Sequence, residues 1–295
     1  MEILKVTGLG KSYGSIKALN DLNMSVEAGQ IYGILGPNGS GKTTTLGILT
    51  GALYQDAGQY TWFQNKHKNP LTRIGTILET PNFFPYLNAS ENLDIVRHIK
   101  KSSDSNFDEI LKLVNLYDRR NSKFATYSLG MKQRLAIAAT MVGSPDVLIF
   151  DEPTNGLDPQ GIADVRMTLQ KVASSGKTVL LASHILDEVE KICSDVAIIK
   201  NGKLLAQGPV GSILSSDKTI EINATDNDRL KTWLTESPII NKYHKGERFY
   251  ECSVEEDLDI GQVSKALSDH QIYVTHLVER KQRLEEEFLQ ITANV

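Results

Sequence analysis

Residues 36–43 contain the side chains and glycines of this sequence that are best suited to hold a phosphate group. They read Gly-Pro-Asn-Gly-Ser-Gly-Lys-Thr and fit the pattern G-x-x-x-x-G-K-S/T. The glycines let backbone N–H groups curl around phosphate oxygens, where a Cβ would obstruct them. Lys42 can neutralise the β- and γ-oxygens, and the Thr43 hydroxyl can ligate Mg²⁺. The motif predicts a nucleotide site.

Two adjacent carboxylates, Asp151 and Glu152, follow the apolar run Val-Leu-Ile-Phe at residues 147–150. Such a run is typical of a strand buried on both faces, and open α/β sheets bind ligands at the C-terminal ends of these strands. Neighbouring strand residues point to opposite faces, so the two carboxylates need different tasks. Asp151 suits an outer-sphere position at Mg²⁺, and Glu152 suits the general base for an attacking water. Taken alone, the pair would be read as a solvated strand end.

A strand–loop–helix unit and a second strand must bring these groups together. Residues 30–35 (QIYGIL) are predicted to form a buried strand, and residues 44–53 a helix after the glycine-rich loop. The helix N-terminus adds partial positive charge beneath the phosphates. Residues 146–152 supply the second strand. These elements indicate an α/β fold.

Composition limits the remaining possibilities. The 295 residues carry 36 acidic and 32 basic side chains, a formal net charge of −4, which argues against a protein that coats nucleic acid. No apolar run approaches the roughly 18–20 residues that span a bilayer, so we expect no membrane crossing. Cys193 and Cys252 are far apart, which excludes a disulfide framework and favours a reducing cytosol.

The charge is divided unevenly along the chain. Residues 216–295 have a net charge of −6 and the preceding residues one of +2. The sequence pattern also changes near residue 215, where short strand-like runs (219–222 and 249–254) begin to alternate with helical patterns. We therefore predict a nucleotide-binding domain over 1–215 and a small C-terminal α+β accessory domain over 216–295. This second domain has no catalytic signature, and residues 284–290 are predicted to form an amphipathic helix in it.

A third motif makes a family recognisable. Residues 127–134 (YSLGMKQR) contain Ser128 and Gly130, which open a helix whose first amides can receive a second anion. This segment resembles the signature sequence of ATP-binding cassette (ABC) proteins. The resemblance implies a P-loop NTPase fold, with a RecA-like core, an antiparallel β subdomain and a helical subdomain. It also implies ATP and Mg²⁺ as cofactors.

Other landmarks follow in the order of that family over residues 1–210. Tyr13 resembles the aromatic residue that stacks on adenine, Asp158 lies in a loop resembling the one that contacts the partner subunit, and His184 resembles the switch histidine at the γ-phosphate. Alone, such a tyrosine or histidine would more often be structural. The resemblance implies nucleotide binding by Tyr13, Gly36, Pro37, Asn38, Gly39, Ser40, Gly41, Lys42, Thr43, Thr44, Ser128, Gly130, Gln133 and Asp158. It implies catalysis by Lys42, Glu79, Glu152 and His184, and Mg²⁺ ligation by Thr43, Glu79 and Asp151.

Glu79 departs from the family pattern, which normally has glutamine in the phosphate-sensing loop. Glutamate ligates Mg²⁺ more strongly but adds a charge and cannot donate a hydrogen bond unless it is protonated. A glutamate here is similar to a subgroup resembling bacitracin-resistance and lantibiotic-immunity transporters. Glu79 either replaces glutamine in positioning water or serves only Mg²⁺ and signalling to a permease.

The next segment contains Phe83, Phe84 and Tyr86 around Pro85. An exposed apolar cluster marks a partner surface, and in the family this region receives a short helix of the membrane subunit. Equally, the three rings could anchor the loop to its own core.

The resemblance implies an ATPase subunit of an ABC exporter, working as a homodimer or as a heterodimer with a related subunit. A transmembrane permease on a separate chain would hold it at the inner face of the membrane in the cytoplasm. We expect no nucleic-acid partner, and export of antimicrobial peptides, lantibiotics or drugs is the implied role. The alternatives are a soluble ABC ATPase that acts on nucleic acid or ribosomes, and a catalytically idle ATP-binding module.

Overall fold

The structure is a computed structural model of the chain. It describes residues 1–78, 82–103, 106–213, 218–255 and 257–280, together with residues 284, 288, 291 and 292. The described residues up to Val210 form one compact unit, and those from Gly211 form a second. The boundary expected near residue 215 lies within residues 214–217, outside the described residues, so the division at 215 stays a prediction.

The first unit is built around a sheet of six strands in the order β5-β6-β7-β3-β8-β9. Neighbouring strands are parallel except β8 and β9, which are antiparallel. The parallel strands β3, β6 and β7 have almost wholly buried residues, as expected for strands covered on both faces. The strands are β3 (Ile31–Leu35), β5 (Ile74–Ile77), β6 (Val147–Asp151), β7 (Thr178–Ser183), β8 (Asp195–Lys200) and β9 (Lys203–Pro209).

A second, antiparallel sheet in the same unit has the order β2-β1-β4. Its strands are β1 (Glu2–Tyr13), β2 (Ile16–Glu27) and β4 (Ala57–Trp62). Buried apolar residues of this sheet, such as Leu4, Leu22 and Trp62, share one core with β3 and α1 (Lys42–Leu49). This arrangement confirms the expected α/β core with an antiparallel β subdomain.

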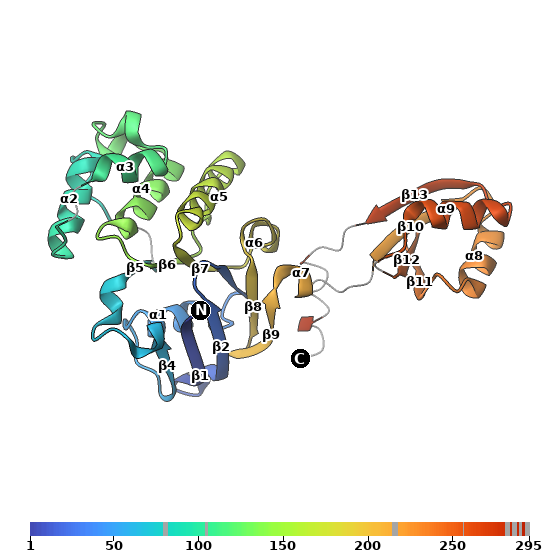
Figure 1. The fold of residues 1–295 in the computed structure, drawn as a ribbon, viewed down its shortest axis with the longest axis horizontal. Coiled ribbons are helices and arrows are strands. Elements are labelled where there is room, and N and C mark those ends of the chain that lie inside the picture. The colour runs from blue at the N-terminus through green and yellow to red at the C-terminus, as the bar shows by residue number, and fades with distance from the viewer. Residues whose placement is uncertain are drawn as a thin grey trace. The chain divides into compact units, whose positions relative to one another are not determined.

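Helices form the third part of this unit, and α2, α3 and α4 gather on one side of it (Figure 1). Helix α4 contacts α2, α3 and α5. The helices are α2 (Ala89–Ile99), α3 (Phe107–Leu113), α4 (Leu129–Met141), α5 (Pro159–Ser174) and α6 (Leu186–Ile192), with 3-10 turns at Phe63–Asn65, Pro70–Arg73, Tyr117–Arg119 and Phe124–Thr126. The short helix α7 (Val210–Ile213) begins at the last described residue of this unit. None of the helices in the described ranges is long and apolar enough to span a membrane.

One predicted helix was placed wrongly. The pattern at residues 44–53 predicted a helix there, whereas α1 begins at Lys42 and ends at Leu49. The Thr50 hydroxyl donates to the carbonyl oxygen of Leu46 at 2.8 Å, and Gly51 has a φ of 76°. A left-handed residue ends a helix because it turns the following backbone away from the helix axis.

The second unit follows the order β-α-β-β-α-β, which is that of ferredoxin-like folds. Its antiparallel sheet has the strand order β11-β12-β10-β13. Buried residues of β10 and β12 pack with the apolar sides of α8 and α9, and both helices lie beside this sheet (Figure 1). The elements are β10 (Lys218–Ala224), α8 (Asn227–Glu236), β11 (Lys242–Lys245), β12 (Tyr250–Val254), α9 (Ile260–Asp269) and β13 (Val274–Arg280). The amphipathic helix expected at residues 284–290 lies largely outside the described residues.

Candidate active site

The glycine-rich loop joins β3 to α1 and its shape depends on glycine. Gly39 and Gly41 have φ angles of 80° and 109°, in a region that other residues rarely adopt. A Cβ on Gly36 would lie 2.2 Å from the carbonyl oxygen of Ile199 and 2.4 Å from Ser40 Oγ. The loop therefore keeps the concave backbone that a phosphate group requires.

Lys42, the first residue of α1, folds back over this loop. Its Nζ donates to the carbonyl oxygens of Gly36 at 2.8 Å and Pro37 at 3.2 Å, and its side chain is only 6% exposed. The same Nζ lies 3.6 Å from Oε1 of Glu152. The ammonium group thus stands between the loop and the acidic end of β6.

Asp151 ends β6 and has the properties of a residue that serves a cation. Its Oδ1 is buried and has no hydrogen-bond partner within the part of the chain that the structure describes. Burial raises the pKa of Asp151, while a hydrogen bond from Thr43 opposes that rise. A buried carboxylate oxygen without a partner, next to a threonine hydroxyl, is a donor set that fits Mg²⁺. The residues present therefore fit the expected metal.

Glu152 leaves the strand direction and turns toward His184. Its φ is 48°, and its backbone N–H donates to the carbonyl oxygen of Ala182 at 3.0 Å. Its Oε2 lies 2.8 Å from Nδ1 of His184, which directly follows β7. The parallel pairing of β6 with β7 brings these two strand ends together. Positive φ at a glutamate is uncommon, and such strain occurs preferentially at functional sites.

The signature segment begins α4. Ser128 caps this helix, and its Oγ accepts from the backbone N–H of Met131 at 3.3 Å. Asp158 caps α5 and accepts from the N–H of Gly161 at 3.0 Å. Among the described residues, no hydrogen bond or ion pair joins Ser128, Gln133 or Asp158 to the phosphate loop. The site of one chain thus unites residues from α1, β6 and β7, while the signature residues lie at the starts of two other helices.

Tyr13 is 48% exposed at the end of β1. The ammonium of Lys11 lies 5.7 Å from its ring centroid and is paired with Asp56 at 2.8 Å. Asp56 also accepts from the N–H of Ser12 at 2.7 Å, and the hydrogen bond from Lys11 lowers the pKa of the Asp56 carboxyl. Asp56 holds the segment that carries Tyr13, a role that no sequence signal indicated because the partner is distant in the chain.

Glu79 lies outside the described residues, so its assignment is untested.

The three aromatic residues after Glu79 do not all fit one of the two alternatives stated for them, which are an anchor of the loop and a partner surface. Phe83 stacks edge-on against Phe124 with ring centroids 5.2 Å apart. Phe84 and Tyr86 are 45% and 64% exposed and lie 5.9 Å apart. One ring therefore anchors the loop, and two remain available to a partner.

Lys100 is a structural residue of this region that sequence reasoning missed. Its Nζ donates to the carbonyl oxygens of Ala139, Thr140 and Val142, at 3.2, 3.0 and 2.9 Å. These carbonyls end α4, whose last groups have no partners within the helix. Burial lowers the pKa of Lys100 to about 8. Lys100 thus fixes the far end of the helix that Ser128 begins.

Comparison with known proteins identifies the family. Residues 19–155 match the family described as ABC transporter. An uncharacterized ABC transporter ATP-binding protein, YdbJ of Bacillus subtilis, is 37% identical over 98% of this chain and 95% of its own length. The bacitracin transport ATP-binding protein BcrA of Bacillus licheniformis is 42% identical, covering 77% of this chain and 76% of BcrA. The lantibiotic transport ATP-binding protein SrtF of Streptococcus pyogenes is 39% identical, covering 70% of this chain and 90% of SrtF.

Solved structures agree with the fold. The ADP conformation of MJ1267, an ATP-binding cassette of an ABC transporter, superimposes with a TM-score of 0.65 at 27% identity, over 72% of this chain and 95% of that one. A dimeric post-hydrolysis state of the ATP-binding cassette MJ0796 with ADP and phosphate superimposes with a TM-score of 0.59 at 26% identity. The superposition covers 70% of this chain and 99% of that one. The fold and site define an ATP-binding cassette. This chain belongs to the family of ABC transporter ATP-binding proteins.

Proposed function

We propose that this chain hydrolyses ATP to drive an ABC exporter whose membrane-spanning permease is a separate chain. The observation that carries this proposal is the position of Glu152, between Lys42 at 3.6 Å and His184 at 2.8 Å. A carboxylate held at a phosphate cradle by a lysine and a histidine is suited to activate water beside a γ-phosphate. An idle ATP-binding module would have no need of that arrangement.

In the proposed reaction the glycine-rich loop and the start of α1 hold the ATP phosphates, and Lys42 exchanges its carbonyl partners for phosphate oxygens. Glu152 orients a water molecule and accepts its proton as the water attacks the γ-phosphorus in line, while the bond from that phosphorus to the β–γ bridging oxygen breaks and ADP leaves. Lys42 and His184 stabilise the charge that develops on the phosphoryl oxygens. Asp151 and Thr43 would hold Mg²⁺, which neutralises phosphate charge when it is bound.

The signature residues complete the site of a second copy. Ser128 and Gly130 lie at the start of α4, whose N-terminal amides can receive an anion. We propose that two copies pair head to tail, so that Ser128, Gly130 and Gln133 of one cover the ATP of the other and Asp158 contacts the partner. The dimer of the MJ0796 cassette supports this arrangement by similarity. A homodimer, or a heterodimer with a related subunit, would then close around ATP and reopen after hydrolysis.

The proposed cargo is an antimicrobial peptide such as a lantibiotic or bacitracin, or a drug, exported for immunity or resistance. The names of BcrA and SrtF support this class. The exposed rings of Phe84 and Tyr86 are the proposed contact with the permease, which would hold the chain at the cytoplasmic face of the membrane.

Copurification tests the partner. The tagged full chain, expressed in its native host and extracted in mild detergent, should recover a polytopic membrane protein. A variant with Phe84→Ser and Tyr86→Ser should recover less of it while keeping ATP binding, whereas Tyr54→Ser, at an even more exposed ring, should not change recovery. Recovery of ribosomes or nucleic acid without a membrane protein would contradict the exporter and favour the soluble alternative.

Glu79 needs its own test, because its role is proposed from the resemblance alone. Glu79→Gln restores the usual side chain of the family. If Glu79 serves water positioning or Mg²⁺, the steady-state rate of phosphate release by the purified chain should change. If it serves only signalling to the permease, that rate should stay constant while stimulation by the permease changes.

A further inference from the structure

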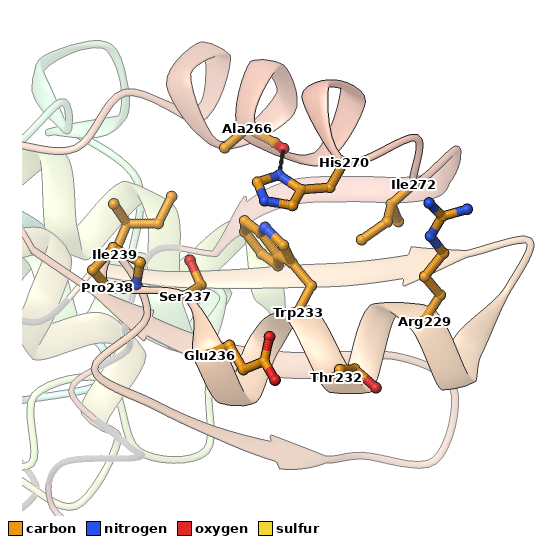
Figure 2. A pocket seen from close by; sticks show the side chains of 10 residues that line it. All are labelled: Arg229, Thr232, Trp233, Glu236, Ser237, Pro238, Ile239, Ala266, His270 and Ile272. Atoms are coloured by element: carbon orange, nitrogen blue, oxygen red, sulfur yellow. Dashed lines mark hydrogen bonds between the residues drawn. The ribbon is translucent and has the colours of Figure 1, made fainter.

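The second unit contains a cavity of about 600 Å³ on the helical side of its sheet. Figure 2 shows its walls, which include Trp233 and Glu236 of α8, Ala266 of α9 and His270 after that helix. Small-molecule sites in proteins have volumes of roughly 300–1,000 Å³. The cavity is therefore large enough for an organic ligand, and it lies in the unit that carries none of the residues assigned to ATP.

The middle of the cavity is apolar and aromatic. Trp233 is 7% exposed, and its ring lies 6.3 Å from that of His270 at an interplanar angle of 63°. Ile239 and Ala266 line the same space, and Ile272 lies farther along it (Figure 2). Such a surface binds the apolar part of a ligand, because a ring or alkyl chain placed there removes its apolar surface from water.

The polar groups around Trp233 favour positive charge. Nδ1 of His270 lies 2.8 Å from the carbonyl oxygen of Ala266. Because a carbonyl only accepts, Nδ1 carries the hydrogen, and Nε2 of the neutral ring is left as an acceptor. Glu236 has no hydrogen bond or ion pair with any residue in the described ranges. The face of the Trp233 indole also attracts cations.

Among the described residues that line the cavity, Arg229 is the one with a permanently cationic side chain. It lies beside Ile272 (Figure 2), and its Nη2 donates to Oε1 of Gln271 at 3.5 Å. Arg229 and Glu236 are two helical turns apart on α8, or about 10 Å at 1.5 Å per residue. Since residues 216–295 carry a net charge of −6, the wider field also favours a cation.

We propose that this cavity binds an amphipathic organic cation. Its ammonium group lies next to Glu236 and donates a hydrogen bond to the Glu236 carboxylate. Its aromatic or aliphatic body packs against Trp233 and Ile239. The ligand class is thus defined by one positive charge at one end and an apolar body at the other.

A matched series of probes tests the class on the full-length chain: 4-phenylbutylamine, 4-phenylbutanol and 4-phenylbutyrate. They share a phenyl ring and a four-carbon chain, whose last carbon is the carboxylate carbon in 4-phenylbutyrate, and they carry a positive, neutral or negative head group. The sequence has only two tryptophans, and Trp62 is 2% exposed with its indole N–H bonded to Leu49. A saturable change in tryptophan fluorescence therefore reports Trp233, and Trp233→Phe provides the blank.

The amine should bind more tightly than the alcohol, and the alcohol more tightly than the carboxylate. Glu236→Gln should lower the affinity for the amine by about 3- to 10-fold, toward the affinity for the alcohol, because the substitution removes one charge-assisted hydrogen bond. Asp228→Asn makes the same charge change on the same helix outside the cavity and should leave the amine's affinity unchanged. Circular dichroism confirms that both variants fold.

Three results would overturn the proposal. One is tightest binding by 4-phenylbutyrate, which would mean that Arg229 selects an anion. Another is an amine affinity that does not respond to Glu236→Gln. The last is the absence of saturable binding of any of the three probes to the wild-type chain, measured independently by isothermal titration calorimetry.

Discussion

Nδ1 of His184 lies 2.8 Å from Oε2 of Glu152, at the adjoining ends of β7 and β6. With Nδ1 bonded to the carboxylate, Nε2 is the ring nitrogen left to face another group. Glu152 is therefore held by two cationic or donor side chains, Lys42 and His184, and its orientation does not depend on a bound ligand. This pair defines the strongest prediction about the chemistry.

Glu152→Gln should retain ATP binding and lose turnover. The amide keeps the size of the side chain but cannot accept a proton from water, so steady-state phosphate release should fall about 10²- to 10⁴-fold. With Mg²⁺ and ATP, the variant should also accumulate as a dimer in size-exclusion chromatography. Hydrolysis at the wild-type rate would show that another residue is the base.

Asp151→Asn should uncouple ATP binding from Mg²⁺. Replacing a carboxylate near the metal should reduce the gain in ATP affinity that Mg²⁺ produces by about 10- to 100-fold. ATP affinity measured in EDTA should stay close to that of the wild type. The midpoint of thermal unfolding should not fall, since burial raises the pKa of this carboxyl and an amide avoids the buried charge. Asp118→Asn, at an exposed position, serves as control. An equal loss of affinity with and without Mg²⁺ would contradict the assignment.

Gly36→Ala should damage the phosphate loop itself. The added Cβ meets the carbonyl oxygen of Ile199 at 2.2 Å, and backbone cannot move aside as a flexible side chain can. We expect the free energy of unfolding to fall by about 1–3 kcal/mol and ATP binding to be lost. Gly211→Ala meets no atom within 4 Å and should change neither. Chemical denaturation and nucleotide titration measure both effects, and a stable variant that binds ATP would refute the close approach.

The lowered pKa of Lys100 predicts in which direction the free energy of unfolding changes with pH. Burial lowers its pKa from 10.5 to about 8, so between these values the unfolded chain binds more protons than the folded one. Stability contributed by this group therefore rises as pH rises from about 8 to 10.5. The difference in unfolding free energy between wild type and Lys100→Met should grow over this range.

The matched control for Lys100 is Lys171→Met, at an exposed lysine in the last turn of α5. Its difference from wild type should stay flat over the same pH range. If instead the Lys100→Met difference shrinks as pH rises, the three carbonyls that accept from Nζ outweigh burial, and the direction of the pKa shift is wrong.

The sequence by itself determined those parts of the protein whose physics is local. The glycine-rich loop and the two carboxylates after an apolar run are short segments, in which backbone freedom and side-chain alternation predict strand, loop and helix start. The α/β core and the ATP-binding family followed from them. The end of α1 did not, because the left-handed Gly51 ended the helix before its apolar pattern did.

Only the tertiary structure decided which distant residues meet. Glu152 and His184 are 32 positions apart, and Lys11 and Asp56 are 45 apart. Lys100 reaches the end of α4 through the packing of helices. No spacing rule predicts such pairs, since they depend on strand order and helix packing. For the same reason the sequence did not predict the cavity beside Trp233. This cavity exists because two helices of the second unit lie on one face of its sheet.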